Sequence, residues 1–358
     1  MDRETVRNDT ESCGDSVMSI GQRGRRVPLS IGVCLWSVVC VCGGRAASAS
    51  PNATVFIALK DTPQYHAVTD PIMTALKPFG VRLKFLFYEN TTPTSELGRD
   101  LAAARPEALI ALDNKAIEDG LTYNRGMASP NDRIAIVGAM GLALAEYGER
   151  DGLTVVPYEA PIAIALRRYE ELAGRLGRVA VVYDELKFGS ALVEASKTFG
   201  GELSGVDVSG FLTDVNNRRD QNVTKGQREI AMAVVTSDAI RFQKPVDAVF
   251  IVVSNEIVQG SNLATWIESL RSLRKPIICG VRELVGVLCD YAVSYSSKGI
   301  AVTVADAVLR GGRGPLYPSL VHLTAVADYA RLRSLGTTLD VGQVVRTPGI
   351  AANYAARH

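Results

Sequence analysis

The feature that most constrains this chain is an alternation of short apolar runs with amphipathic stretches, which begins at residue 53. Runs such as 108–112 and 248–253 are apolar throughout, as is typical of strands that are buried on both faces. The stretches between them have the spacing of helices that cover a sheet on one side. Because parallel strands need such crossover helices, we predict an α/β fold with parallel sheets.

The alternation falls into two series, which predicts two Rossmann-like (flavodoxin-like) lobes. In the first series we expect strands at 53–59, 81–88, 108–112 and 133–139, and helices at 71–79, 95–104 and 114–124. In the second we expect strands at 178–183, 202–208, 248–253 and 276–280, and helices at 160–176, 189–199, 225–236 and 262–273. The segment 148–161 between the series carries Gly, Pro and charge, as a crossing between lobes does.

Residues 1–50 have the pattern of a secretory signal peptide. Arginines at 23, 25 and 26 precede an apolar stretch at 27–42, and small residues follow at 46–50. Such small side chains fit the signal peptidase, so we expect cleavage near Ala49 and export to the periplasm. An uncleaved anchor is the alternative, and Met18 is a second candidate start. Val39 stands where a lipoprotein has a small residue before its cysteine, so anchoring through Cys40 or Cys42 is not favoured.

Charge and cysteine content narrow the partners and the chemistry. Thirty-nine Lys and Arg against 38 Asp and Glu give a formal net charge of +1, which provides no field for nucleic acid or an anionic membrane. Four of the six cysteines lie in the leader, so only Cys279 and Cys289 remain in the mature chain. Since Cys279 ends an apolar run, we expect two buried, reduced thiols rather than a bridge.

The sequence lacks the motifs of common enzyme sites. Its three histidines, His66, His322 and His358, are scattered, and no phosphate-binding glycine loop or nucleophile elbow follows a strand. We therefore expect no metal, no cofactor and no enzymatic activity. One enzymatic alternative stays open, namely a hydrolase with dispersed carboxylates such as Asp113 and Asp184 facing each other.

Several segments together resemble a known family. They are 105–116, 152–154 followed by 178–184, 275–278, 282–286, 292–295 with Gly299, and 328–336. In order and spacing this set resembles the ABC-transporter substrate-binding proteins that include tryptophan- and tyrosine-binding members. The chain departs from that family at 139–143, where an Asp-Pro turn is usual, and at 287–290. The resemblance is therefore to a divergent member.

The resemblance implies the type I periplasmic-binding fold, with two lobes joined by three hinge crossings. We expect one lobe at 53–157 with 288–312, the other at 158–287 with 313–340, and a tail at 341–358. The implied function is capture of a small polar solute by hinge closure and its delivery to an ABC-transporter permease in the inner membrane. The identity of the solute does not follow from the resemblance; the residue types of the cleft loops favour an amino-acid-like one. We expect a monomer. A ligand-sensing partner of a membrane receptor would share this fold and site, so that alternative stays open.

In open parallel sheets, ligands bind beyond the carboxyl ends of the strands, near helix N-termini. The loops at these positions offer cations, carboxylates and aromatic rings, which are the groups that a zwitterionic solute needs. The candidate ligand-binding residues are Lys60, Asp61, Tyr65, Asp113, Asn114, Met140, Asp184, Glu185, Phe188, Ser190, Ser254, Asn255, Glu256, Arg282, Glu283, Tyr295 and Ser296. Asp113 and Ser254 also have the positions of helix caps.

Overall fold

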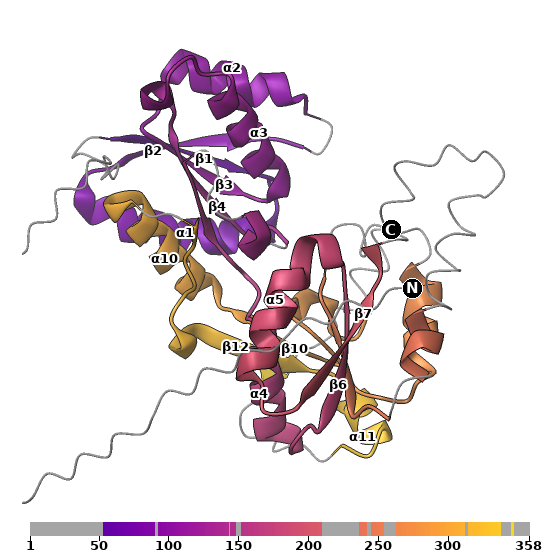
Figure 1. Cartoon of the computed structure of the whole chain (residues 1–358). Coiled ribbons are helices and arrows are strands. Elements are labelled where there is room, and N and C mark those ends of the chain that lie inside the picture. The colour runs from indigo at the N-terminus through magenta and orange to yellow at the C-terminus, as the bar shows by residue number, and fades with distance from the viewer. Residues whose placement is uncertain are drawn as a thin grey trace, which may run out of the picture. The chain divides into compact units, whose positions relative to one another are not determined.

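A computed structural model describes residues 53–89, 92–142, 144–147, 152–209, 236–241, 245–253, 263–311, 314–337 and 345–346 (Figure 1). These residues form two separate sheets of mainly parallel strands with flanking helices, which confirms the predicted α/β class. The expected leader, most of the expected tail and nearly all of the helix expected at 225–236 lie outside the described residues.

The first sheet has the strand order β11-β5-β4-β3-β1-β2. All of its pairings are parallel. Its strands are β1 (Thr54–Leu59), β2 (Arg82–Phe87), β3 (Ala108–Leu112), β4 (Ala135–Ala139), β5 (Leu153–Val156) and β11 (Gly314–Pro315). Along β1, Val55 and Ile57 enter one apolar core, while Phe56 and Ala58 enter another. This alternation explains why the run is apolar at every position: both faces of the sheet are covered.

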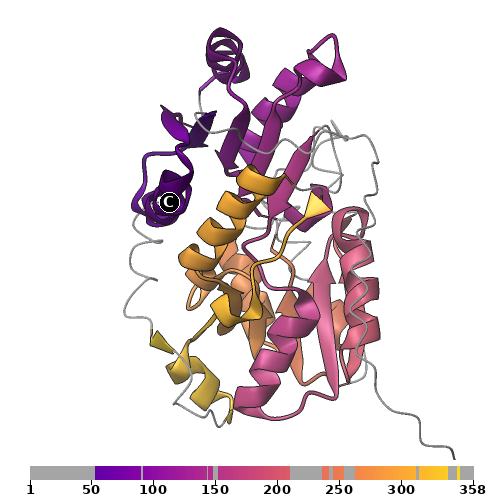
Figure 2. The same ribbon diagram turned by 90° about the vertical axis from the view of Figure 1, so that its left-hand side faces the viewer.

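Four helices cover the first sheet. They are α1 (Pro63–Leu76), α2 (Thr94–Ala104), α3 (Asn114–Arg125) and α10 (Ser297–Arg310). Helices α1 and α10 lie side by side (Figures 1 and 2) and contribute Val68, Ile72 and Val304 to one core. On the opposite face, α2 and α3 contribute Leu101 and Ile117 to the other.

The second sheet has the strand order β13-β12-β10-β9-β8-β6-β7. Its strands are β6 (Arg178–Tyr183), β7 (Glu202–Asp207), β8 (Ala248–Ile251), β9 (Ile277–Cys279), β10 (Tyr291–Tyr295), β12 (Leu323–Ala327) and β13 (Val345–Arg346). Its helices are α4 (Ile162–Ala173), α5 (Glu185–Thr198), α9 (Leu263–Arg271) and α11 (Tyr329–Ser334). One face packs on α4 and α5 through Leu166, Tyr169 and Phe188. The β10–β12 pair is antiparallel, unlike the other pairings of this sheet.

The chain passes between the sheets at three places. It leaves the first sheet after β5 to enter α4, returns after β10 to enter α10, and leaves again after β11 to enter β12. The expected boundaries assign 288–312 to the first lobe, yet β10 pairs with β9 of the second sheet, and β11 pairs with β5 of the first. The apolar pattern of a strand does not show which strand it will pair with, so these boundaries could not be placed from the sequence. From the observed pairings we propose one lobe at 53–157 with 296–315 and the other at 158–295 with 316–337.

One local expectation is incomplete and another is wrong. The segment 148–161, expected as a crossing between lobes, leads into the second sheet but also contains strand β5, whose four residues are all buried. The helix expected to begin at 71 begins at Pro63, with Pro71 inside it. Proline suits the first turn of a helix because it lacks the N–H that is unpaired there, and two prolines in this stretch offered two possible starts.

Candidate functional site

Lys60 and Asp113 meet at the carboxyl ends of β1 and β3. The Lys60 Nζ lies 2.8 Å from Asp113 Oδ2, and Asp113 Oδ1 accepts a 2.9 Å hydrogen bond from the Ala116 N–H. Asp113 is buried, whereas Lys60 remains partly exposed. The carboxylate therefore has two functions: it caps α3, and it neutralises a cation at the edge of the sheet.

Two tyrosines lie next to this ion pair. Burial, together with the nearby Asp113 carboxylate, raises the pKa of both Tyr65 and Tyr88. The Lys115 Nζ lies 5.9 Å from the centroid of the Tyr88 ring and 2.6 Å from Asp119 Oδ2. This edge of the first sheet thus combines aromatic rings with charges that are paired within the lobe.

Tyr88 and Lys115 are absent from the residues predicted from the sequence. Tyr88 is the last residue of the expected strand 81–88, and Lys115 directly follows the predicted site residue Asn114. Both residues lie near the carboxyl end of a strand, where ligands bind in open parallel sheets. The sequence could therefore have pointed to them.

Asn114 and Met140 shape the loop that follows β4. The Asn114 side-chain amide donates to the Leu142 carbonyl, and its oxygen accepts from the Leu142 N–H, both at 2.8 Å. Met140 is buried and has a φ of 58°, in the left-handed region that bulky residues rarely adopt. Asn114 and Met140 thus lie at the sheet edge where the ligand site was predicted, but their contacts hold the loop and the core.

Asp61 is exposed, and its Oδ1 lies 2.7 Å from the Nε2 of His66.

In the second lobe, Asp184 and Glu185 lie at the start of α5. Asp184 is buried and its Oδ1 accepts a 3.1 Å hydrogen bond from the Leu186 N–H, so it caps the helix. Glu185 accepts a hydrogen bond from the Tyr183 hydroxyl; burial, followed by that bond, raises the pKa of Tyr183 to about 12. Ser190 is exposed on the same helix.

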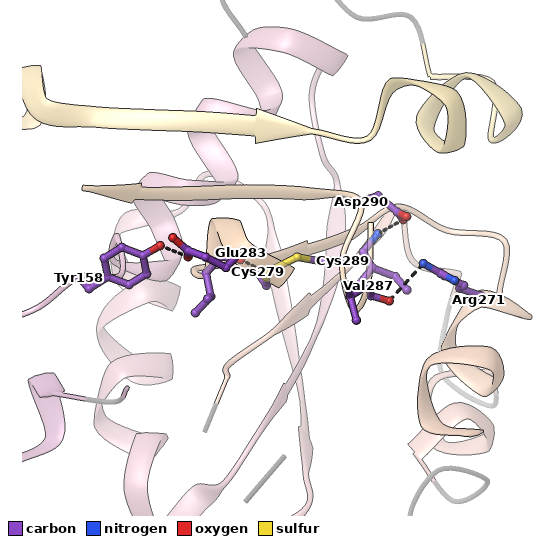
Figure 3. The surroundings of a disulfide bond; sticks show 9 residues. Tyr158, Arg271, Cys279, Glu283, Val287, Cys289 and Asp290 are labelled. Atoms are coloured by element: carbon purple, nitrogen blue, oxygen red, sulfur yellow. Dashed lines mark hydrogen bonds between the residues drawn. A yellow bond between two sulfur atoms is a disulfide. The ribbon is translucent and has the colours of Figure 1, made fainter. Parts of the chain in front are cut away.

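Arg282 and Glu283 follow β9, and Glu283 contacts Tyr158 of the first crossing (Figure 3). The Arg282 Nε donates to Glu283 Oε1 at 2.9 Å, and its guanidinium lies 5.7 Å from the centroid of the Tyr158 ring. The Tyr158 hydroxyl donates to the Glu283 carboxylate. Burial, and then the Glu283 charge, raise the pKa of Tyr158. Tyr158 was not predicted, because the sequence pattern marks 148–161 only as a linker.

Cys279 and Cys289 form a disulfide, contrary to the expectation of two reduced thiols (Figure 3). Both residues are fully buried, and their Cα atoms lie 6.0 Å apart. Burial is compatible with either a disulfide or two free thiols, so it could not decide between them. The deciding feature is that the end of β9 and the start of β10 are neighbours in the sheet, with Cys279 opposite Ala292. The bridge closes the loop that carries Arg282 and Glu283.

The remaining predicted residues fall into three groups. Phe188 and Tyr295 are buried in the apolar cores, and burial raises the pKa of Tyr295 to about 12. Ser296 caps α10 by accepting a 3.2 Å hydrogen bond from the Gly299 N–H. Ser254, Asn255 and Glu256 lie outside the described residues.

Within the described part of the chain, no group of three or more His, Cys, Asp or Glu side chains is placed to hold a metal ion. None of the helices described there combines the length and apolar character that a bilayer crossing requires.

The two sheets, their helices and the three crossings define the type I periplasmic-binding fold. Solved structures share it: an ABC domain in complex with L-Trp from Streptococcus pneumonia has a TM-score of 0.51 at 14% identity, covering 82% of this chain and 99% of that chain. A conserved domain protein from Vibrio cholerae gives 0.53 at 13%, with 83% and 100% covered. An open, ligand-free substrate-binding protein with adhesive properties from Clostridium difficile gives 0.52 at 13%, with 82% and 99% covered. At these identities the likeness concerns the fold.

No protein-family model matches the chain. Human protein PML is 33% identical over 133 residues, which is 33% of this chain and 15% of the length of PML. A match to so small a part of a relative carries no function to this chain.

Proposed function

We propose that this chain is an exported solute-binding protein, which captures a small zwitterionic or neutral solute between its lobes and delivers it to an ABC transporter. The observation that carries the proposal is the Lys60–Asp113 pair, which lies where the strands of a parallel sheet end and helix α3 begins. In folds of this type that edge is where ligands bind. The likeness in fold to a solved ABC domain in complex with L-Trp and to a solved substrate-binding protein supports an ABC transporter as the partner that receives the solute.

The charges at both sheet edges indicate the class of solute. Lys60 pairs with Asp113, Lys115 with Asp119, and Arg282 with Glu283. A solute with a net charge would leave one partner of such a pair uncompensated, which is most costly at the buried carboxylates of Asp113 and Asp119. A zwitterion offers an ammonium to the carboxylates and a carboxylate to the cations. An amino-acid-like solute therefore fits these edges.

The same contacts favour binding over catalysis. In the hydrolase alternative, Asp113 and Asp184 would transfer protons or attack substrate. Instead, each accepts a backbone N–H at a helix start, and Asp113 also faces Lys60. Both carboxylates are therefore engaged in holding helix starts, which does not place them to act as an acid or a nucleophile. We therefore propose that the protein is not an enzyme.

The deciding experiment is a thermal-shift screen of the purified mature chain. Amino acids, including aromatic ones, come first, followed by nucleosides, sugars and small carboxylates. A ligand at about a hundredfold excess over its Kd adds about 2.7 kcal/mol to the unfolding free energy, which such a screen detects. Hits are then measured by calorimetry and by small-angle scattering, because a solute that touches both lobes shifts the hinge toward a more compact form.

Variants link the hits to the proposed site. Arg282→Ala and Asp113→Asn should abolish the ligand-induced shift. Asp100→Ala, at an exposed position of α2, is the matched control and should leave the shift intact. Full affinity in both site variants would contradict the proposed site. A tight ligand without compaction would contradict capture by closure.

A further inference from the structure

The second lobe contains a cavity which, of the predicted ligand-binding residues that the structure describes, only Phe188 borders. Its volume is 170 Å³, and it lies between the first turn of α4, helix α5 and the carboxyl end of β8. The apolar part of its lining includes Ile162, Phe188, Ala191, Ala195, Phe250 and Val252. Glu159, Glu194, Thr198 and Tyr317 also border it.

The cavity reaches the surface beside Glu194, Thr198 and Tyr317, which are exposed. Its inner lining is buried, as at Phe188 and Phe250. Ordered water in such a space needs about two to four polar partners, and most of this lining is apolar. The void depends on small side chains: Ala191 and Ala195 are one turn apart on α5 and both line it. A larger residue at either position would fill the space. The cavity therefore persists because this helix presents alanines there.

The cavity is separate from the charged residues at the sheet edges. The residues that line it come from the second lobe and from two of the crossings: Pro157 belongs to the first crossing and Tyr317 to the third. Lys60, Asp113 and Arg282 do not border it. An occupant would therefore touch only one lobe together with the crossings, and would have no contact that pulls the first lobe closed.

We propose that this cavity is a second ligand site, which takes a compact, uncharged apolar or aromatic molecule. An apolar cavity of about 150 Å³ in another protein binds benzene, so the volume here suits a single ring. The described residues of the lining include two carboxylates, Glu159 and Glu194, but no cation, so a zwitterion would lack a partner for its own carboxylate there.

The test uses benzene and indole as probes on the full mature chain, with affinity measured by calorimetry and by thermal shift. Ala191→Leu should fill the cavity and weaken probe binding roughly tenfold or more. Ala195→Val is a smaller filling step, for use if the leucine variant does not fold. Ala173→Leu, near the end of α4 and outside the lining, is the control and should bind like the parent chain.

Saturable probe binding that the filling variants lose, and that Asp113→Asn and Arg282→Ala keep, would establish the second site. The same pattern would hold even if the solute screen found nothing, so the two proposals fail separately. Absence of saturable binding to the parent chain would reduce the cavity to a packing defect. Binding lost in Asp113→Asn or Arg282→Ala would assign the probes to the solute site, and binding kept in both filling variants would place them elsewhere. Each of these three results overturns the proposal.

Discussion

Lys60 Nζ and Asp113 Oδ2 lie 2.8 Å apart, although 53 positions separate the residues along the chain, and their pairing exists because β1 and β3 are adjacent parallel strands. The same carboxylate caps α3 through its other oxygen. Charge neutralisation and helix capping therefore depend on one side chain, and substitutions can separate the two.

Asp113→Asn should keep the cap and lose the charge, since an asparagine oxygen also accepts the Ala116 N–H. We expect an unfolding free energy within about 1 kcal/mol of the parent chain, together with loss of the solute-induced shift. Asp113→Ala should lose both, and its unliganded stability should fall by about 1 kcal/mol or more. Urea denaturation of the two variants, with and without solute, measures this. An unchanged solute shift in Asp113→Asn would assign Asp113 to structure alone.

Tyr158→Phe removes the hydroxyl that joins the first crossing to the Glu283 carboxylate. Because a net hydrogen bond contributes about 0.5–1.5 kcal/mol, stability should fall by that amount. Tyr123→Phe on α3 provides a control substitution of the same chemistry. Equal denaturation midpoints for Tyr158→Phe and the parent chain would show that this contact adds nothing to stability.

Reduction of the Cys279–Cys289 bridge should lower the unfolding free energy by about 2–3 kcal/mol, because a closed loop of this length restricts the unfolded chain. The double variant Cys279→Ala/Cys289→Ala should show the same loss without reductant. Denaturation with and without dithiothreitol measures the effect, and thiol titration of the unfolded, unreduced chain should detect neither Cys279 nor Cys289. Two titratable thiols would mean that the bridge does not form.

Two glycines at helical positions should respond to alanine in opposite ways. A Cβ on Gly299 would overlap the His322 side chain in the third crossing, so Gly299→Ala should cost about 1–3 kcal/mol. A Cβ on Gly98, inside α2, would meet nothing within 4 Å. Gly98→Ala should therefore stabilise the chain by about 0.5–1 kcal/mol. Thermal unfolding of the two variants side by side tests the pair, and equal effects would refute the packing difference.

Asp207 should make part of the stability depend on acid pH. Burial alone would raise the pKa of this carboxyl, but the N–H groups of Ser209 and Glu185 and the Ser209 hydroxyl outweigh it and lower the pKa. A lowered folded-state pKa means that the stabilisation is complete above the unfolded pKa of about 3.9 and is lost as pH falls through the lower folded value. Asp207→Asn should therefore flatten the acid side of a stability–pH profile, whereas Asp100→Asn should leave it unchanged. Superimposable profiles for Asp207→Asn and the parent chain would contradict the assignment.

Much of the architecture follows from local patterns in the sequence. Uninterrupted apolar runs predicted β1, β3, β6 and β8 closely, because a strand that is covered on both faces has no polar positions. The order of polar residues after those runs also predicted Asp113 as a helix cap, which it is, whereas the cap at Asp184 was not predicted because the following helix was expected to begin only at 189. These features depend on neighbours along the chain, which a sequence displays directly.

Tertiary structure alone decided which distant segments became partners. The pairing of β10 with β9 brought Cys279 next to Cys289, and the path of the first crossing brought Tyr158 onto Glu283. The sequence determined that the chain forms two α/β series with polar groups at the strand ends. Strand neighbours, the disulfide and the apolar cavity depend on long-range packing, in which many weak contacts are satisfied together, and local residue patterns do not encode that arrangement.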